Sequence, residues 1–314
     1  MKVYLNRKPR EGPWGGANKV VSKLANTLLR AGNSIAYTLN HDNIDVIFCF
    51  DPRPNDNGEW YGDMLEYKKK FNAKIIQRVG DLGTHGKPEL TSLVKQSLPH
   101  SDYIIFPSSW ARDKIGYKEK NCEIVNNAPL EVFHKFKKNK KLGKKIKLIT
   151  HHWSTNPKKG FTFYKSLDKF IGENKDKFSF TYIGRIPDGF SFENTNYIEA
   201  TGDNEFLAKK LAAADIYITA SREEAGANHV LEAMASGLPV AYHAFGGSIL
   251  NYCKPYGEEF SCDRLDNPDG SSFLNAIDKI TDSYSSYKDK VMKYDEGTGK
   301  IIETYERIIC NLAK

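Results

Sequence analysis

The stretch SREEAGANHVLEAMASGLPVAYHAFGG, residues 221–247, decides the predicted fold of this chain. A short β-branched run, DIYITA at residues 215–220, precedes it, and a second apolar run, PVAYHA, occupies residues 239–244. A loop of small residues and a helical segment lie between the two runs, so the order is strand, loop, helix, strand. This order predicts a βαβ unit within a parallel sheet.

Two carboxylates, Glu224 and Glu232, flank the entry to the predicted helix. Gly226 and Ala227 are small enough for a ligand to approach the backbone, and Asn228 is predicted to be the N-cap. The N–H groups of a helix start favour an anion, and carboxylates accept hydrogen bonds from hydroxyls. The pattern predicts a ligand with phosphates and hydroxyls, straddled by the two acids. The alternative, two exposed acids at a helix start, stays open because Asp and Glu favour first turns.

The Glu224 and Glu232 spacing, the run EAMASGLPV at residues 232–240 and the double glycine at 246–247 resemble the E-x7-E signature of retaining glycosyltransferases of family 4. The resemblance implies the GT-B fold, an α/β architecture of two Rossmann-like, doubly wound parallel-sheet domains facing a cleft. It also implies that Glu224 contacts the donor sugar and that Glu232 holds the ribose of the nucleotide. Residues 225–227 read Ala-Gly-Ala where the family usually has Gly-Phe-Gly, so the resemblance does not specify the sugar.

The domain organisation follows from the length and from the alternation of strand and helix patterns. At 314 residues the chain can form two domains, each with its own core. We expect residues 1–143 to form an acceptor domain and residues 144–295 to form the nucleotide-sugar donor domain. The resemblance implies that residues 296–314 form a helix that crosses back to the first domain.

A second loop of interest, HHWSTNPKKGF at residues 151–161, follows the first predicted strand of the donor domain. By resemblance, Lys159 supplies a cation to the donor pyrophosphate. The family usually has an arginine earlier in this loop, and here His151 and the next histidine stand near its place. Arg185, after Gly184, is the candidate for a second cation. The alternative for Lys159 is a solvated lysine at a helix entry.

A glycine-rich loop also separates the opening strand pattern, residues 3–5, from the helical pattern of residues 17–30. A strand, glycine loop and helix in this order can cradle a phosphate. Gly15 and Gly16 are the candidates, by resemblance to the first loop of the GT-B enzymes. A tight turn is the alternative explanation for the two glycines.

The acceptor side is expected on loops that follow parallel strands of the first domain, because ligands of doubly wound sheets lie beyond the carboxyl ends of the strands. The loop RVGDLGTHG, residues 78–86, contains two polar side chains, Asp81 and His85, that can contact an acceptor hydroxyl. An exposed histidine without a role is the alternative for His85.

The composition of the chain indicates its cellular location, the state of its cysteines and the role of its excess charge. The chain has no run of about 18 apolar residues and no secretory pattern at its start, so we expect a cytoplasmic protein. The five cysteines lack metal-ligand spacing and are expected to be free thiols, and we predict no metal site. The net charge of +7 is concentrated in the lysine-rich residues 135–147, which we interpret as a solvated linker. The alternative is peripheral contact with anionic lipid on the inner face of the membrane.

These observations predict a retaining glycosyltransferase of hexosyltransferase type that moves a sugar from a UDP-sugar or GDP-sugar to a hydroxyl acceptor. The acceptor is a glycan, a lipid-linked molecule or a small molecule, and no cofactor, divalent metal or nucleic acid is expected. Two alternatives of related fold are a nucleotide-sugar epimerase and a sugar phosphorylase. A non-enzymatic protein that binds sugars or nucleic acid is the third alternative.

Overall fold

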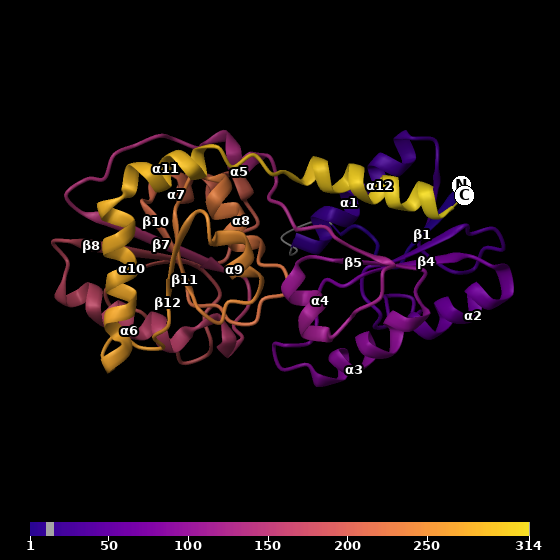
Figure 1. The fold of residues 1–314 in the computed structure, drawn as a ribbon, viewed down its shortest axis with the longest axis horizontal. Coiled ribbons are helices and arrows are strands. Elements are labelled where there is room, and N and C mark those ends of the chain that lie inside the picture. The colour runs from indigo at the N-terminus through magenta and orange to yellow at the C-terminus, as the bar shows by residue number, and fades with distance from the viewer. Residues whose placement is uncertain (11–15, 314) are drawn as a thin grey trace. The chain divides into compact units, whose positions relative to one another are not determined.

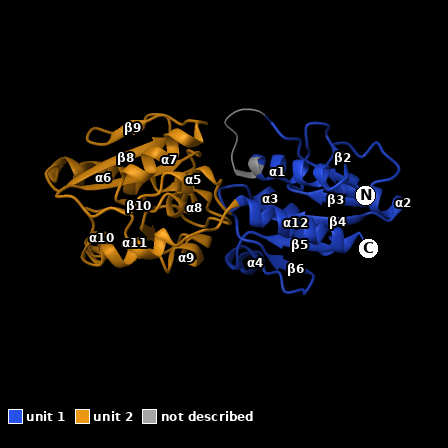
Figure 2. Cartoon of the chain, turned by 90° about the horizontal axis from the view of Figure 1, so that it is seen from above, with its two compact units in different colours: residues 1–127, 298–314 blue, residues 128–297 orange. Residues whose placement is uncertain are grey.

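The computed structural model describes residues 1–10 and 16–313, which form two compact units (Figure 2). Unit 1 comprises residues 1–127 and 298–314, and unit 2 comprises residues 128–297. Each unit contains one sheet of six parallel strands with helices packed on it (Figure 1). The α/β class and the two doubly wound sheets predicted from the sequence are therefore observed.

The sheet of unit 1 has the strand order β2-β1-β3-β4-β5-β6. Its strands are β1 (Lys2–Leu5), β2 (Ser34–Ala36), β3 (Val46–Cys49), β4 (Lys74–Arg78), β5 (Tyr103–Phe106) and β6 (Cys122–Ile124). Strand β1 lies between β2 and β3 and is parallel to both. The chain therefore reverses its direction of winding around β1, which creates a topological switch point beside that strand.

The helices of unit 1 cover this sheet and include one from the end of the chain. They are α1 (Gly16–Arg30), α2 (Tyr61–Phe71), α3 (Pro88–Ser97) with the 3₁₀ turn η1 (Leu98–His100), α4 (Ser109–Ile115) and α12 (Thr298–Leu312). Every residue of β3 is buried, as expected for a strand covered on both faces.

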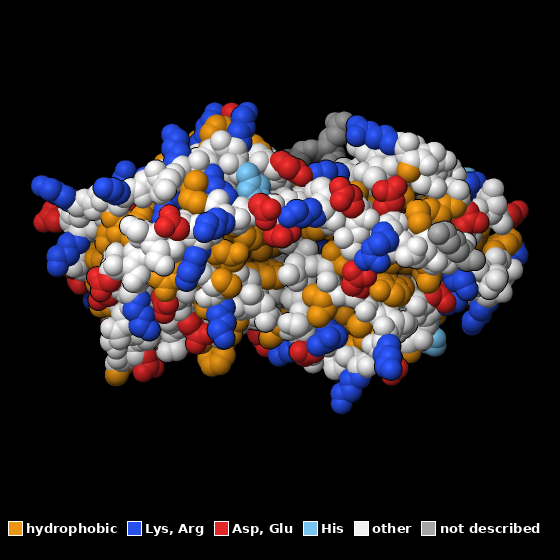
Figure 3. Space-filling view, turned by 45° about the horizontal axis from the view of Figure 1, so that its top comes forward, with side chains coloured by type: hydrophobic (Ala, Val, Ile, Leu, Met, Phe, Trp, Pro, Cys, Tyr) orange, Lys and Arg blue, Asp and Glu red, His pale blue; other side chains and the backbone are white. Residues whose placement is uncertain are grey.

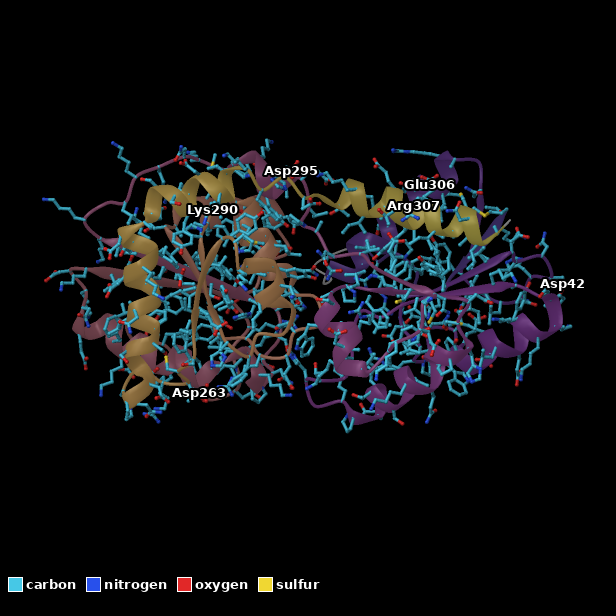
Figure 4. The ribbon with its side chains drawn as sticks, viewed as in Figure 1. Asp42, Asp263, Lys290, Asp295, Glu306 and Arg307 are labelled. Atoms are coloured by element: carbon cyan, nitrogen blue, oxygen red, sulfur yellow. The ribbon has the colours of Figure 1, made fainter. Side chains whose placement is uncertain are left out.

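The C-terminal helix α12 packs beside α1 and completes unit 1. Its Tyr305 is buried, and the Tyr305 hydroxyl accepts a hydrogen bond of 2.9 Å from Nε of Arg78 at the end of β4. Arg307, labelled in Figure 4, pairs with Glu123 at 2.7 Å. The last helix is thus anchored by a buried hydrogen bond and by an ion pair at the surface.

The sheet of unit 2 has the strand order β12-β11-β10-β7-β8-β9. Its strands are β7 (Ile146–His152), β8 (Phe178–Gly184), β9 (Asn196–Ile198), β10 (Ile216–Thr219), β11 (Val240–His243) and β12 (Gly257–Phe260). The central strands β10 and β11 are buried along their whole length. The βαβ unit predicted from residues 215–244 is present as β10, α8 and β11.

Helices on both faces enclose this second sheet. They are α5 (Val132–Lys135), α6 (Phe161–Glu173), α7 (Asn204–Ala213), α8 (Asn228–Ala235), α9 (Ser248–Cys253), α10 (Ser271–Asp282) and α11 (Tyr284–Met292), with the 3₁₀ turns η2 (Pro157–Lys159) and η3 (Pro268–Gly270). Asp203 caps α7 by accepting hydrogen bonds from the backbone of Glu205 and Phe206, as aspartate often does at a helix start.

The lysine-rich segment 135–147 is exposed over most of its length, as the interpretation as a solvated segment predicts, but it is part of unit 2 and contacts it. Phe133, just before the segment, is fully buried in a core cluster of that unit. The Lys137 ammonium donates to the backbone carbonyl of Tyr294 at 2.6 Å, and Lys140 pairs with Asp215 at 2.8 Å. Residues 128–143 consequently belong to unit 2, and the first unit ends at residue 127 rather than at residue 143.

The surface charge is mixed on the face shown in Figure 3, where Lys and Arg side chains alternate with Asp and Glu. Among the helices of the described residues, none has both the length and the apolar character needed to cross a bilayer.

Candidate functional site

The candidate site lies at the carboxyl edge of the sheet of unit 2, where the neighbouring strands β7, β10 and β11 end. The loops that follow these strands lie side by side and are joined by backbone hydrogen bonds. Arg222 N donates to Lys158 O at 2.8 Å, and Glu223 N donates to Phe245 O at 2.8 Å. The three loops therefore form one connected surface in front of helix α8.

The backbone of Glu224 is clamped by the loop after β11. Glu224 N donates to Gly246 O at 3.2 Å, and Ser248 N donates to Glu224 O at 2.8 Å. Gly247 has a φ of +72°, and a Cβ at this position would lie 2.6 Å from Glu224 O. Only glycine fits there, which gives the double glycine of the sequence motif a steric explanation.

The Glu224 side chain forms an ion pair with Lys159, and each of the two side chains is only 12% exposed. Lys159 ends the turn η2, and Gly160 follows it with a φ of +88°. A Cβ on Gly160 would lie 2.4 Å from Cβ of Ala220, so glycine allows the loop to approach the end of β10. In this Lys-Gly pair, Lys159 supplies the cation, and Gly160 allows the backbone conformation that places the cation beside Glu224.

A second ion pair, between Lys158 and Glu223, lies next to the first in sequence but is more exposed, at 40% and 29%. Glu223 has a φ of +51°, a conformation that is uncommon for residues other than glycine. Backbone strain of this kind is frequent at functional sites. The strained residue directly precedes the acid that was predicted to contact the sugar.

Glu232 lies within α8 and is paired with a residue that was not predicted to contact it. Its Oε2 accepts a hydrogen bond of 2.8 Å from Nε2 of His151, the penultimate residue of β7. The Tyr217 hydroxyl lies 3.2 Å from Nδ1 of His151 and fixes the other side of the ring. The only sequence signal for this contact was the place of His151 at the end of a central strand.

Helix α8 begins one residue earlier than predicted. Its N-cap is Ala227, and Asn228 is the first helical residue, so the prediction that Asn228 caps the helix is wrong. The φ and ψ of Ala227, −76° and 86°, precede the helical turn, and Ala227 N donates to Oγ of Ser248 at 3.2 Å. Because alanine has no side-chain acceptor, the helix start has no side-chain cap, and its positive end favours an anion.

His152, next to His151, is fully enclosed beneath the site. Its Nε2 lies 2.6 Å from the Tyr164 hydroxyl, and its Nδ1 has no hydrogen-bond partner among the described residues. Burial, with contributions from His229 and Lys159, holds the pKa of His152 well below its usual value of 6.5. The ring is therefore neutral at pH 7 and is not a replacement for the arginine of the family motif.

The proposed second cation, Arg185, lies just after β8. Its guanidinium stacks on the ring of Trp153 at 4.5 Å, and its backbone N donates to His152 O at 3.2 Å. Gly184 has a φ of +143° and pairs with His152 across β7 and β8. Both residues therefore border the loop that also contains Lys159.

The positions of the candidate residues in unit 1 give less support for a role in ligand binding. Gly15 lies outside the described residues, and Gly16 is the first residue of α1. The Asp81 carboxylate accepts hydrogen bonds from Gly83 N and from the Lys87 ammonium, both at 2.8 Å. Asp81 thus holds its own loop together, and His85 is a half-buried residue of the same loop.

Metal-ligating side chains do not gather in the part of the chain that the structure describes. Residues 1–10 and 16–313 contain no group of three or more His, Cys, Asp or Glu residues that could hold a metal ion. The five cysteines are free thiols, as expected from their spacing.

Comparison with solved structures defines the class of fold. The chain is similar to a glycosyltransferase from Rickettsia africae ESF-5, with a TM-score of 0.69, 12% identity and coverage of 100% of this chain and 98% of that one. It is similar to Anabaena Alr3699/HepE in complex with UDP and glucose, with a TM-score of 0.67, 13% identity and coverage of 99% and 100%. For the sucrose-phosphate synthase of Thermosynechococcus elongatus, the TM-score is 0.64, the identity 14% and the coverage 99% and 97%. The predicted GT-B fold is confirmed.

Part of the sequence of unit 2 is similar to a known family. Residues 148–280 match the family model described as glycosyl transferases group 1. This segment contains Lys159, Glu224 and Glu232, and the match confirms the resemblance to group 1 glycosyltransferases. A comparison with curated proteins finds no similar sequence.

Proposed function

We propose that this protein is a retaining glycosyltransferase that transfers a hexosyl group from a nucleotide diphosphate sugar to a hydroxyl acceptor. One observation carries the proposal: both acids of the Glu224 and Glu232 pair are held by basic residues of a single segment, residues 151–159, in front of the start of α8. The group 1 match over residues 148–280 and the complex of the similar Anabaena protein with UDP and glucose support this class of donor.

The diphosphate would bind to Lys159 and to the N-terminus of α8. Departure of a nucleoside diphosphate builds negative charge on its phosphate oxygens, and preorganised donors stabilise that charge. A lysine ammonium has three N–H donors, so Lys159 can keep Glu224 as one partner while it donates to a phosphate oxygen. These groups supply the positive charge that the reaction needs, so we propose that transfer proceeds without a divalent metal.

Glu224 would orient the donor sugar, and Glu232 would bind the ribose. A carboxylate accepts hydrogen bonds from hydroxyls and cannot donate them when ionised. Glu232 uses Oε2 for His151, and a carboxylate has two oxygens with which to accept further bonds. We assign neither acid as a nucleophile, because a leaving phosphate oxygen can take the acceptor proton and the incoming hydroxyl can attack the face that the phosphate leaves.

Thermal unfolding with a panel of UDP-sugars and GDP-sugars, with and without a chelator, tests this function. We expect at least one donor to raise the unfolding temperature, because a ligand that binds only the folded state stabilises it. We expect the same shift in chelator and slow release of nucleoside diphosphate from that donor. An NMR assignment of the product anomer then tests retention. If none of the donors shifts the transition, the proposal fails.

The epimerase and phosphorylase alternatives predict different products from the same donor. An epimerase would convert the nucleotide sugar without release of a glycoside, and a phosphorylase would require inorganic phosphate as a substrate. Tight binding of RNA or DNA without any response to nucleotide sugars would favour the non-enzymatic alternative. NMR analysis of the products of one set of reactions distinguishes the transferase, the epimerase and the phosphorylase.

A further inference from the structure

A cavity of about 410 Å³ lies in unit 1 at the carboxyl edge of its sheet. Its lining comes from the loops that follow three neighbouring strands: Asn6, Arg7, Lys8 and Arg10 after β1, Tyr37 and Thr38 after β2, and Asn55, Asp56 and Asn57 after β3. These strands flank the point where the winding of the sheet reverses. In doubly wound sheets, ligands bind at such switch points.

The lining is positively charged, with three basic side chains against one acidic side chain. Arg10 pairs with Asp56 at the exposed rim. The Arg7 guanidinium donates to Pro54 O and Arg53 O at 3.2 Å and 3.3 Å and pairs with Asp51 at 3.2 Å. These bonds fix the Arg7 guanidinium at the cavity wall, so little side-chain entropy remains to be lost on binding.

Lys8 and Tyr37 provide the polar groups that the surrounding protein does not use. Within the described ranges 1–10 and 16–313, neither the Lys8 ammonium nor the Tyr37 hydroxyl has a hydrogen-bond or ion-pair partner. Tyr37 is half-buried, and burial raises the pKa of its phenol, so the phenol stays a neutral donor. A cavity lined by both an ammonium and an aromatic hydroxyl suits an anionic group attached to a hydroxylated ring.

The remaining walls are held in place by a half-buried carboxylate. Glu59 accepts hydrogen bonds from the Tyr4 hydroxyl at 2.8 Å, from the Thr38 hydroxyl at 2.8 Å and from the Asn55 amide at 3.0 Å. Burial opposes its ionisation, but these bonds and one from the backbone of Leu39 lower the pKa of Glu59 below its usual value. The loops after β2 and β3 and strand β1 itself are thus tied to one ionised group, which helps to preform the cavity.

We propose that this cavity binds an anionic sugar, in which a hydroxylated ring carries a carboxylate or a phosphate. The inference rests on the proposed function, because it names the chemical class of the acceptor. Lys8 and Arg7 bind the anion, and Tyr37 contacts the ring. Asp81 and His85, the acceptor candidates from the sequence, do not line this cavity.

Titration calorimetry with the full chain tests the inference using four probes: glucuronate, glucose 6-phosphate, methyl glucoside and inorganic phosphate. We expect the two charged sugars to bind about tenfold more tightly than methyl glucoside, as one charged hydrogen bond implies. Glucose 6-phosphate should also bind more tightly than inorganic phosphate, and its affinity should fall as salt is added.

Substitutions then test whether the sugar binds in this cavity. Lys8→Gln should weaken the affinity for glucose 6-phosphate about fivefold, because it removes one charge that is partly screened by solvent. Lys74→Gln removes the same charge from the start of β4, at the opposite edge of the same sheet, and should leave the affinity unchanged. The inference is overturned if Lys8→Gln has no effect, if methyl glucoside binds as well as the charged sugars, or if inorganic phosphate binds as well as glucose 6-phosphate.

Failure of this inference can be told apart from failure of the proposed function. A protein that is stabilised by a nucleotide sugar but binds none of the charged sugars is a transferase for a different acceptor class. Conversely, the protein could bind charged sugars without any response to nucleotide sugars. That result would support the ligand class inferred for the cavity of unit 1 and would contradict the proposed transferase function.

Discussion

Oε2 of Glu232 lies 2.8 Å from Nε2 of His151, so an acid on helix α8 is held by the end of strand β7. Both side chains are largely buried, at 13% and 10% exposure. A hydrogen bond to a carboxylate in such surroundings restricts its rotation, which leaves the second oxygen in a fixed direction. In the proposed function, His151 is therefore a positioning residue for the group that binds ribose.

His151→Ala should weaken nucleotide binding about tenfold, because it removes one charge-assisted hydrogen bond from Glu232. KM for the nucleotide sugar should rise while kcat changes little, since the ribose contact is made equally in the ground state and the transition state. Steady-state kinetics and calorimetry measure both quantities.

The matched control for this prediction is His41→Ala, which removes an exposed imidazole of unit 1. The double variant His151→Ala with Glu232→Gln should be little worse than Glu232→Gln alone, because the two residues act as a pair. Fully additive losses would show that His151 acts independently of Glu232.

Lys159→Gln should lower kcat/KM by about 100-fold, the usual effect of removing a donor that stabilises developing negative charge. The adjacent Lys158 provides the control, since its pair with Glu223 is more exposed than the Lys159 pair with Glu224. Lys158→Gln should change kcat/KM by about twofold or less. A larger loss for Lys158→Gln than for Lys159→Gln would mean that the two neighbours have been assigned the wrong way round.

Gly247→Ala should destabilise the protein by about 3 kcal/mol, because it combines a positive φ with a clash against the backbone of Glu224. Gly189 is a matched control in the same unit: its φ is +74°, and a Cβ there would meet nothing within 4 Å. Gly189→Ala should cost only about 1 kcal/mol. Denaturant unfolding of the two variants measures the difference, and equal losses would remove the steric explanation.

The buried lysine of α11 predicts a pH dependence of stability. Lys288 is 2% exposed, its ammonium donates to Gly237 O near the end of α8, and burial lowers its pKa from 10.5 to about 8. Between pH 8 and 10 the unfolded chain keeps this proton and the folded chain loses it, so the contribution of Lys288 to stability rises with pH.

Lys288→Met should abolish this rise. The free energy of unfolding of the wild type, relative to that of the variant, should increase by about 2 kcal/mol from pH 8 to pH 10. The comparison with the variant cancels the titration of other groups. A difference that stays constant over this range would show that Lys288 titrates normally.

The fold and the acid pair could be predicted because they depend on local patterns. The β-branched run of β10, the small residues before α8 and the apolar run of β11 each specify their own conformation. The contacts between side chains of the site could not be predicted in the same way. His151 reaches Glu232 across 81 positions of sequence, and only the order of β7 and β10 in the sheet brings the two together.

One prediction failed for a physical reason that a single sequence does not reveal. Asn228 has the residue type of an N-cap, but the clamp on Glu224 and the contact of Ala227 with Ser248 start the helix at Asn228 itself. The lysines of segment 135–147 are mostly exposed, as their charge predicts, but two of them also contact other parts of unit 2. Long side chains can satisfy buried carbonyls, as Lys137 does at Tyr294.

The central claim is that Glu224 and Glu232 bind different parts of one nucleotide sugar at the start of α8. The most direct measurement is a paired determination of donor affinity and turnover for Glu224→Gln and Glu232→Gln, alongside wild type. We predict that Glu224→Gln lowers kcat by about 100-fold with nucleotide affinity nearly unchanged, and that Glu232→Gln mainly weakens nucleotide binding. The reverse pattern, or two variants that bind and turn over the donor as the wild type does, would contradict the account.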